Sequence, residues 1–162
     1  GAYCMRISMN ILANREDSEE NVSDTYLRVW NSVPPQRPHF LAAFLGRIAR
    51  NLALNRRAAA NAEKRGGGEA ELSLEELAEC LPSGSEPQSE AEAAAFSHVL
   101  SDFLRTESKD ARQVFLQRYF ECRPVAQIAG HFGFSESKVK SMLMRTRTRL
   151  AQYLIRGGWS DE

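Results

Sequence analysis

The stretch from Arg123 to Tyr153 constrains the fold more than any other part of the chain, because it reads as two helices joined by a tight turn. Counted from Val125, the small residue Ala129 falls at the fifth place and Gly133 at the ninth. A small residue lets two helices cross closely, and a glycine adopts the positive φ that the turn requires. This spacing is typical of a helix-turn-helix motif.

The second helix of this motif has an apolar side and a basic side. Ser135 is predicted to cap its first turn. Apolar positions spaced at four, three, four and three residues predict one buried face. These positions are Val139, Leu143, Thr146, Leu150 and Tyr153, and the opposite side holds Lys138, Lys140, Ser141, Arg145, Arg147 and Arg149.

The charge of this stretch separates two interpretations of the second helix. Residues 123–156 carry seven basic side chains and one acidic side chain, Glu136. A surface helix that needed only solubility would mix the two signs. The excess of positive charge therefore favours a recognition helix in the major groove of DNA.

The net charge of zero hides a strongly uneven distribution along the 162 residues. Residues 1–65 carry ten basic and six acidic side chains, residues 66–100 carry none and eight, and residues 101–162 carry eleven and seven. Salt screens charges beyond about 10 Å, so local charge decides nucleic-acid binding. Two basic modules flank an acidic connector.

Catalytic, metal and membrane signals are missing from the sequence. The cysteines Cys4, Cys80 and Cys122 form no CxxC pair, which argues against a disulfide framework or a zinc site and fits a reducing cytoplasm. The three histidines are isolated, and HExxH, GxSxG and P-loop motifs are absent. No apolar run approaches the roughly 18 residues of a membrane span. We expect no enzyme activity, metal or cofactor, and we expect the natural start to lie upstream.

The N-terminal half is predicted to form three helices. The first covers Tyr3–Ala13, and the second begins with Asp17 as its N-cap. Its predicted buried stripe is Val22, Tyr26, Val29, Trp30 and Val33. The proline-rich segment 34–38 ends it, and a third helix resumes near His39.

The remaining chain is also helical in pattern. Gly66–Gly68 breaks the third helix and opens a flexible acidic linker over residues 66–92, in which 72–81 could form one or two helical turns. Helices are predicted for Ala91–Leu104 and Lys109–Phe120 before the helix-turn-helix. The expected fold class is all-α, with two small helical domains over residues 1–65 and 93–162, the second a four-helix unit.

Three blocks of the sequence resemble an extracytoplasmic-function (ECF, group 4) sigma factor of bacterial RNA polymerase, from the sigma-70 superfamily. NREDSEENVSDTYLRVW resembles region 2.2, and FLAAFLGRIARNLALNRR resembles regions 2.3 and 2.4. ARQVFLQRYF and AQIAGHFGFSESKVKSMLMRTRTRLAQYL resemble regions 4.1 and 4.2. The resemblance implies promoter recognition at the −10 and −35 elements and DNA melting, with core RNA polymerase and promoter DNA as partners. It also admits an anti-sigma factor, and it implies a cytoplasmic location.

The resemblance implies roles for residues of the N-terminal module. Glu20, Asp24 and Arg28 would contact the clamp helices of the polymerase. The loop from Asn31 to His39 would capture a base flipped from the −10 element, because a pocket that binds the extruded base offsets the cost of unstacking. The residues implied at the −10 element are Arg37, His39, Arg47, Arg50, Asn51, Asn55 and Arg57.

In the C-terminal module the resemblance implies contacts with the −35 element. Lys140, Ser141, Met144 and Arg145 stand where family members read base edges, and basic side chains suit guanine. Ser135, Arg123 and Arg149 are expected to meet phosphates, and Lys138 belongs to the same surface.

Two other classes of protein were weighed. A helix-turn-helix regulator would bind duplex DNA without core polymerase, whereas a sigma factor should bind DNA weakly alone and strongly with the core enzyme. A nucleic-acid enzyme would need a catalytic or metal-binding cluster, and the sequence offers none.

Overall fold

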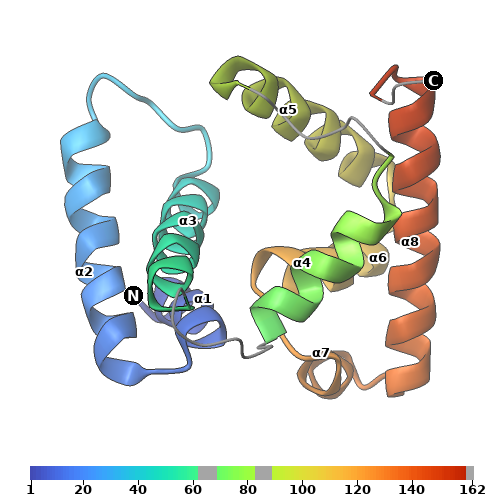
Figure 1. Ribbon diagram of the computed structural model, residues 1–162, viewed down its shortest axis with the longest axis horizontal. Coiled ribbons are helices and arrows are strands. Elements are labelled where there is room, and N and C mark those ends of the chain that lie inside the picture. The colour runs from blue at the N-terminus through green and yellow to red at the C-terminus, as the bar shows by residue number, and fades with distance from the viewer. Residues whose placement is uncertain (62–68, 83–88, 160–162) are drawn as a thin grey trace. The chain divides into compact units, whose positions relative to one another are not determined.

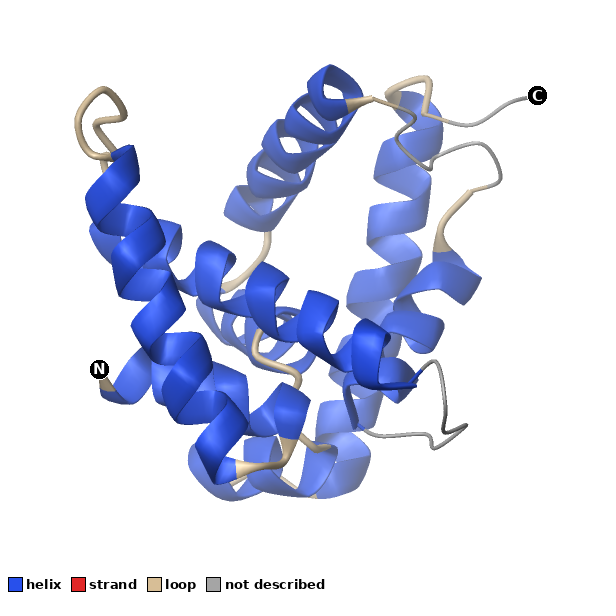
Figure 2. Ribbon diagram, turned by 60° about the vertical axis from the view of Figure 1, so that its left-hand side comes forward, coloured by secondary structure: helices blue, strands red, loops and turns tan. Residues whose placement is uncertain are grey.

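The computed structural model describes residues 1–61, 69–82 and 89–159, and every regular element among them is a helix (Figure 1; Figure 2). The predicted all-α fold class is therefore confirmed. No helix in these ranges is long and apolar enough to cross a membrane. The helices are α1 (Ala2–Leu12), α2 (Arg15–Ser32), α3 (Leu41–Asn61), α4 (Glu69–Cys80), α5 (Glu90–Thr106), α6 (Lys109–Phe115), α7 (Val125–Phe132) and α8 (Glu136–Arg156), with a π-helical turn η1 (Leu116–Phe120) after α6.

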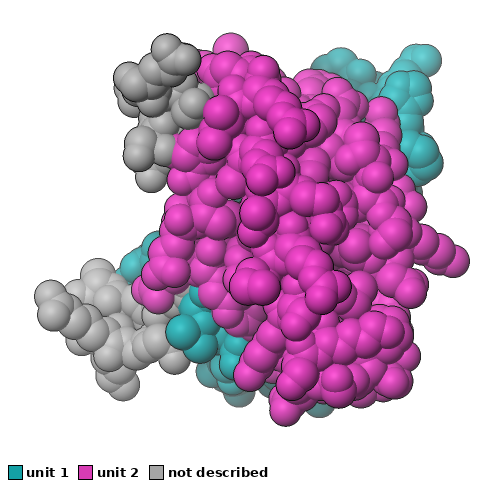
Figure 3. Space-filling model, turned by 90° about the vertical axis from the view of Figure 1, so that its right-hand side faces the viewer, with its two compact units in different colours: residues 1–72, 120–123 teal, residues 73–119, 124–162 magenta. Residues whose placement is uncertain are grey.

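The chain divides into two compact units (Figure 3). Unit 1 consists of residues 1–72 and 120–123, and unit 2 consists of residues 73–119 and 124–162. The predicted break at Gly66–Gly68 and the centre of the predicted linker, residues 83–88, lie outside the described residues. The boundaries predicted for the two domains and the linker stay a prediction.

Unit 1 packs α1, α2 and α3 against one another through an apolar cluster that includes Ile7 and Ile11 and through a set of small and polar side chains. The Nδ2 group of Asn21 on α2 donates hydrogen bonds to Ser8 Oγ on α1, at 2.9 Å, and to the Ala49 carbonyl on α3, at 3.0 Å. The buried side chains at this junction are Ser8, Ser18, Asn21, Thr25, Ala49 and Ala53. Their small volume lets the three helices approach closely.

The buried stripe predicted for α2 is wrong: Val22 and Val29 are only half-buried, and Val33 and the two aromatic positions are exposed. Trp30 is 82% exposed and Tyr26 is 43% exposed, whereas Asn21 and Thr25 are fully buried. The interior of unit 1 is already filled by other side chains, including the fully buried Ile7 and Ile11. A Cβ atom at Gly46 of α3, for example, would lie 2.7 Å from the Tyr3 hydroxyl oxygen.

The start predicted for α2 is also corrected. Asn14 rather than Asp17 is the N-cap, and its side chain accepts a hydrogen bond from the Asp17 amide at 3.1 Å. Ala13 takes a left-handed conformation with φ of 54° and separates α1 from this cap. The helix therefore begins at Arg15, and the acids Glu16 and Asp17 lie in its first turn, where they favour the helix dipole.

Unit 2 contains the predicted helix-turn-helix, which the structure confirms. Gly133 ends α7 with φ of 70°, and the Ser135 side chain caps α8 by accepting from the Lys138 amide at 3.1 Å. Of the five predicted buried positions, Val139, Leu143, Thr146 and Leu150 are each at most 2% exposed, whereas Tyr153 is half-buried. They pack with Phe103, Val114, Phe115, Ile128 and Leu154 of α5, α6, α7 and α8.

Two further segments differ from the sequence-based expectation in detail. α4 is 12 residues long, more than the one or two turns predicted, and Leu77 and Leu81 pack against the unit 2 core. The helix predicted over residues 109–120 consists of α6 followed by η1. The wider π-helical turn carries Arg118 and Tyr119, and both side chains are buried.

Candidate nucleic-acid interface

The exposed face of α8 presents most of the residues predicted for the −35 element. Lys140, Met144 and Arg145 are exposed, and Ser141 is half-buried. Their positions on one side of α8 follow from the opposite side being the buried stripe. Their side chains carry positive charges, a hydroxyl group and a thioether. Such groups can contact both phosphates and base edges.

Two further predicted residues lie at the N-terminal end of this face. Ser135 holds the first turn of α8 through its cap. The Lys138 ammonium lies 3.7 Å from the centre of the Phe134 ring, so a cation–π contact holds it near the turn. The helix-turn-helix therefore brings six of the eight predicted −35 residues to one end and one side of α8.

The other two predicted −35 residues are engaged by acids. Arg149 forms a bidentate pair with Glu107, at 2.9 and 2.5 Å, and this pairing raises the pKa of its guanidinium. Arg123 lies in unit 1, where its side chain is 11% exposed and its Nε is 3.1 Å from Glu121. A phosphate would have to displace these carboxylates from the two arginines or bind the arginines together with them.

Five of the seven residues predicted for the −10 element lie on α3, where they separate into two groups, and Arg37 and His39 precede this helix. Arg47, Asn51 and Asn55, spaced four residues apart, are all exposed and lie on one face. Arg50 lies on another side, with its guanidinium 5.7 Å from the centre of the Phe120 ring, and burial lowers its pKa. Arg57 is half-buried and donates a hydrogen bond to the Ile11 carbonyl at 2.6 Å.

The predicted polymerase-binding residues lie on α2. Arg28 is exposed, while Glu20 and Asp24 both pair with Arg56 of α3. The side chains of Glu20 and Asp24 remain 65% and 45% exposed, so they are accessible to a partner. Sequence analysis did not identify Arg56 as their partner, because it lies more than thirty residues away on another helix.

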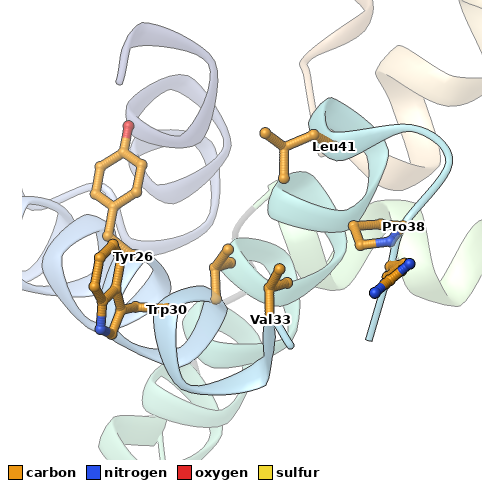
Figure 4. Close-up of a pocket in the computed structure, with 7 residues that line it drawn as sticks. Tyr26, Trp30, Val33, Pro38 and Leu41 are labelled. Atoms are coloured by element: carbon orange, nitrogen blue, oxygen red, sulfur yellow. The ribbon is translucent and has the colours of Figure 1, made fainter. Parts of the chain in front are cut away.

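An apolar pocket in unit 1 is lined partly by the loop from Asn31 to His39, to which the resemblance assigned base capture, and partly by residues that were not predicted. It has a volume of about 620 Å³ and lies where α2 ends and α3 begins (Figure 4). Its lining consists of Tyr26, Val29, Trp30, Val33, Arg37, Pro38 and Leu41. Val33, Arg37 and Pro38 belong to that loop, and Arg37 was also named as a DNA-binding residue. His39 lies beside the pocket in sequence and is exposed. The sequence signal for the α2 side of this pocket was the apolar stripe of α2, whose aromatic side chains Tyr26 and Trp30 are exposed.

The described residues were also searched for metal-binding groups. Across residues 1–61, 69–82 and 89–159, no group of three or more histidine, cysteine, aspartate or glutamate side chains is placed to hold a metal ion. Cys4, Cys80 and Cys122 form no disulfide within the same ranges. Burial raises the pKa values of Cys4 and Cys80.

Two protein-family models match the chain, and their positions follow the helices described above. Sigma-70 region 2 matches residues 2–63, which hold α1, α2 and α3. Sigma-70, region 4, in the form found in ECF-type factors, matches residues 108–150, which hold α6, α7 and most of α8. A comparison with curated proteins found no match.

Together the two matches cover well over half of the chain, in the order expected from the three sequence blocks. A helix-turn-helix regulator that acts without core polymerase is not favoured, because the region 2 match accounts for the N-terminal helices. Sigma-70 domains are non-catalytic transcription initiation factors that act with core polymerase on promoter DNA. The chain therefore belongs to the sigma-70 superfamily and is an ECF-like RNA polymerase sigma factor.

Proposed function

We propose that the two modules of this sigma factor divide promoter recognition between the −10 and −35 elements. The module over residues 1–65 binds core polymerase and opens the −10 element, and the module over residues 93–162 reads the −35 element. The pocket beside Trp30 and Arg37 is the observation that carries this proposal, because it offers an unstacked base a place to bind.

The pocket has the chemistry that an extruded base needs. A volume of about 620 Å³ is enough for one base, and the aromatic and aliphatic lining suits its apolar faces. Stacking a base on an aromatic side chain contributes about 1–3 kcal/mol, comparable to the cost of unstacking. Arg37 supplies a positive charge for the adjoining phosphate. We therefore place capture of a −10 base here, with His39 at the edge of the site.

The melted strand continues along α3. The exposed line of Arg47, Asn51 and Asn55 presents one charge and two amides to the backbone and bases of a single strand. We assign Arg50 and Arg57 an electrostatic role toward the same melted DNA strand. Both are turned toward the protein, so they contribute positive potential behind the exposed line.

At the −35 element, α8 enters the major groove with its exposed face. Lys140, Ser141, Met144 and Arg145 contact base edges, and Ser135 and Lys138 contact phosphates near the helix start. Arg123 and Arg149 add phosphate contacts by exchanging a carboxylate partner for a phosphate.

The surface for core polymerase is the acidic side of α2. Glu20 and Asp24 are held by Arg56, which orders two flexible side chains before they meet the polymerase. Arg28 extends this surface. An anti-sigma factor that occluded this surface would block assembly. We place the protein in the cytoplasm with its polymerase, and we assign it no enzyme activity.

The proposal is tested with the full chain and purified core polymerase. We expect the two to co-elute on a sizing column and to transcribe from a subset of a promoter library that shares −10 and −35 sequences. The variant Glu20→Lys/Asp24→Lys reverses the charge of the α2 surface and should abolish co-elution. Glu16→Lys/Glu19→Lys, on exposed residues of the same helix, is the matched control. A wild-type chain that bound duplex DNA but never core polymerase would refute the proposal.

A further inference from the structure

Glu76 of α4 lies among three hydrogen-bonding side chains of unit 2. Its carboxylate accepts from Arg118, through Nε at 3.3 Å and Nη2 at 2.8 Å, and from the Tyr119 hydroxyl at 3.2 Å. Arg147 Nη1 is 3.7 Å from the same carboxylate and donates to the Tyr119 oxygen at 2.5 Å. The three side chains come from η1 and α8, and they converge on one anion.

The surroundings of this carboxylate favour an anion strongly. The Arg118 side chain is only 3% exposed, and a charge that is so buried requires a counter-ion. Burial raises the pKa of Tyr119 to about 12, so its hydroxyl stays protonated and remains a donor at neutral pH. Two guanidinium groups and a hydroxyl are the donors that carboxylates and phosphates share.

Arg147 connects this cluster to the exposed face of α8. It lies seven residues after Lys140, which is two helical turns along the same line of the helix. Its side chain is 21% exposed, so it faces both Glu76 and solvent. The cluster therefore borders the surface to which we assign −35 binding.

α4 begins with the fully buried Ala70 and Ser73, whereas residues 74–80, which cover the cluster, are all exposed or half-buried. Leu77 and Leu81, through which the segment contacts the unit 2 core, are only partly buried. Glu76 itself is 37% exposed. The covering segment also carries further acids, Glu75 and Glu79, which are exposed and repel an approaching phosphate backbone.

We propose that Arg118, Tyr119 and Arg147 form an anion-binding site that Glu76 occupies in the free chain and a DNA backbone phosphate occupies in the promoter complex. α4 is then an intramolecular competitor of duplex DNA at α8. The inference rests on the proposed role of α8 in −35 binding. It adds a phosphate site that the exposed face of α8 does not contain, and it explains why the free chain should bind duplex weakly.

The first test compares Glu76→Gln with Glu75→Gln in the full chain. The two variants remove the same charge from the same helix, but only Glu76 lies in the cluster. Binding to a short fluorescent DNA duplex is measured by anisotropy at several salt concentrations. We expect Glu76→Gln to bind about threefold to fivefold more tightly, the size of one ion pair, and its salt slope to steepen by about one. Equal affinities for the two variants would overturn the proposal.

A double variant tests whether the gain passes through Arg147. In Glu76→Gln/Arg147→Gln the extra affinity and the extra salt dependence should both disappear. Arg147→Gln alone should weaken duplex binding and lower its salt slope, because it removes one of the donors to the phosphate. A gain that persisted without Arg147 would contradict the assignment of the site, and so would the absence of duplex binding by every variant at low salt.

Hydrogen exchange of the wild-type chain provides a measurement that does not depend on any variant folding. Saturating duplex should speed exchange of the α4 amides, since the DNA displaces α4 from its site. Unchanged or increased protection of α4 would refute the competition. Promoter-specific transcription by the wild-type holoenzyme is measured in parallel. Absence of transcription would count against the proposed function. Transcription without faster exchange of the α4 amides would count against the α4 competition alone.

Discussion

Arg149 on α8 and Glu107 between α5 and α6 form two parallel hydrogen bonds, at 2.9 and 2.5 Å. The Glu107 side chain is only 7% exposed, whereas that of Arg149 is 47% exposed. The pair therefore fastens the recognition helix to the preceding helices from one side. A residue that the charge pattern assigns to DNA thus also has a structural role in unit 2.

Replacing Arg149 with alanine should affect both stability and DNA binding. The change leaves the largely buried Glu107 carboxylate without this partner, and we expect the free energy of unfolding to fall by about 1–2 kcal/mol, discounted for the exposure of the arginine. Duplex binding should weaken by a similar factor for all sequences, as for a phosphate contact. Urea unfolding and anisotropy on two unrelated duplexes measure the two effects. Wild-type stability combined with an altered sequence preference would disprove both roles.

Replacing Arg145 with alanine should change recognition and leave stability unaltered. Arg145 is exposed on the face of α8 assigned to base edges, so its loss should weaken −35 binding by about 1–3 kcal/mol and relax the preference at one base pair. Holoenzyme binding to a library varied at the −35 element measures the change. Arg105→Ala removes an exposed arginine of unit 2 outside α8 and serves as control. A uniform loss across the library would instead make Arg145 a phosphate contact.

Asn21 is predicted to be a stability determinant of unit 1. Asn21→Ala removes the side chain that bridges Ser8 and Ala49, and it leaves a small cavity where three helices meet. We expect a loss of about 1–3 kcal/mol in the free energy of unfolding. Ser23→Ala is the matched control, since Ser23 is exposed on the same helix and bonds only its own backbone turn at Glu19. Equal midpoints for the two variants in urea unfolding would show that the bridge contributes nothing.

In unit 2, the buried face of α8 and the turn before it could be predicted from the sequence, because the helical spacing of apolar residues determines how α8 packs. The α8 stripe of Val139, Leu143, Thr146 and Leu150 was predicted and is buried, and Gly133 has the predicted positive φ. Both features are local, since a helical face and a turn glycine can be recognised within a few residues.

The packing of unit 1 was less predictable, because small and polar side chains are buried in its interior beside Ile7 and Ile11. Hydrophobicity favoured Trp30 as a buried residue, but Asn21 and Thr25 fill the junction of α1, α2 and α3. The ion-pair partners of the charged residues could not be predicted from the sequence either. Glu107 with Arg149, and Arg56 with Glu20, are brought together by the tertiary fold and leave no periodic signal in the sequence.

Trp30 offers the sharpest test of the −10 pocket, because its side chain is 82% exposed and contributes to the pocket rather than to the core. Trp30→Ala should change the free energy of unfolding by less than about 0.5 kcal/mol. The loss of one stacking surface should reduce promoter opening by about tenfold or more, since stacking contributes about 1–3 kcal/mol per base. Opening is measured from a fluorescent base analogue at the −10 element, with core polymerase saturated by the sigma factor. Leu27→Ala removes a side chain that is 60% exposed on the same helix but outside the pocket lining, and it should leave opening unchanged. If both variants opened DNA like the wild type, the base would have to bind elsewhere, and the pocket would be left as a contact surface for the polymerase.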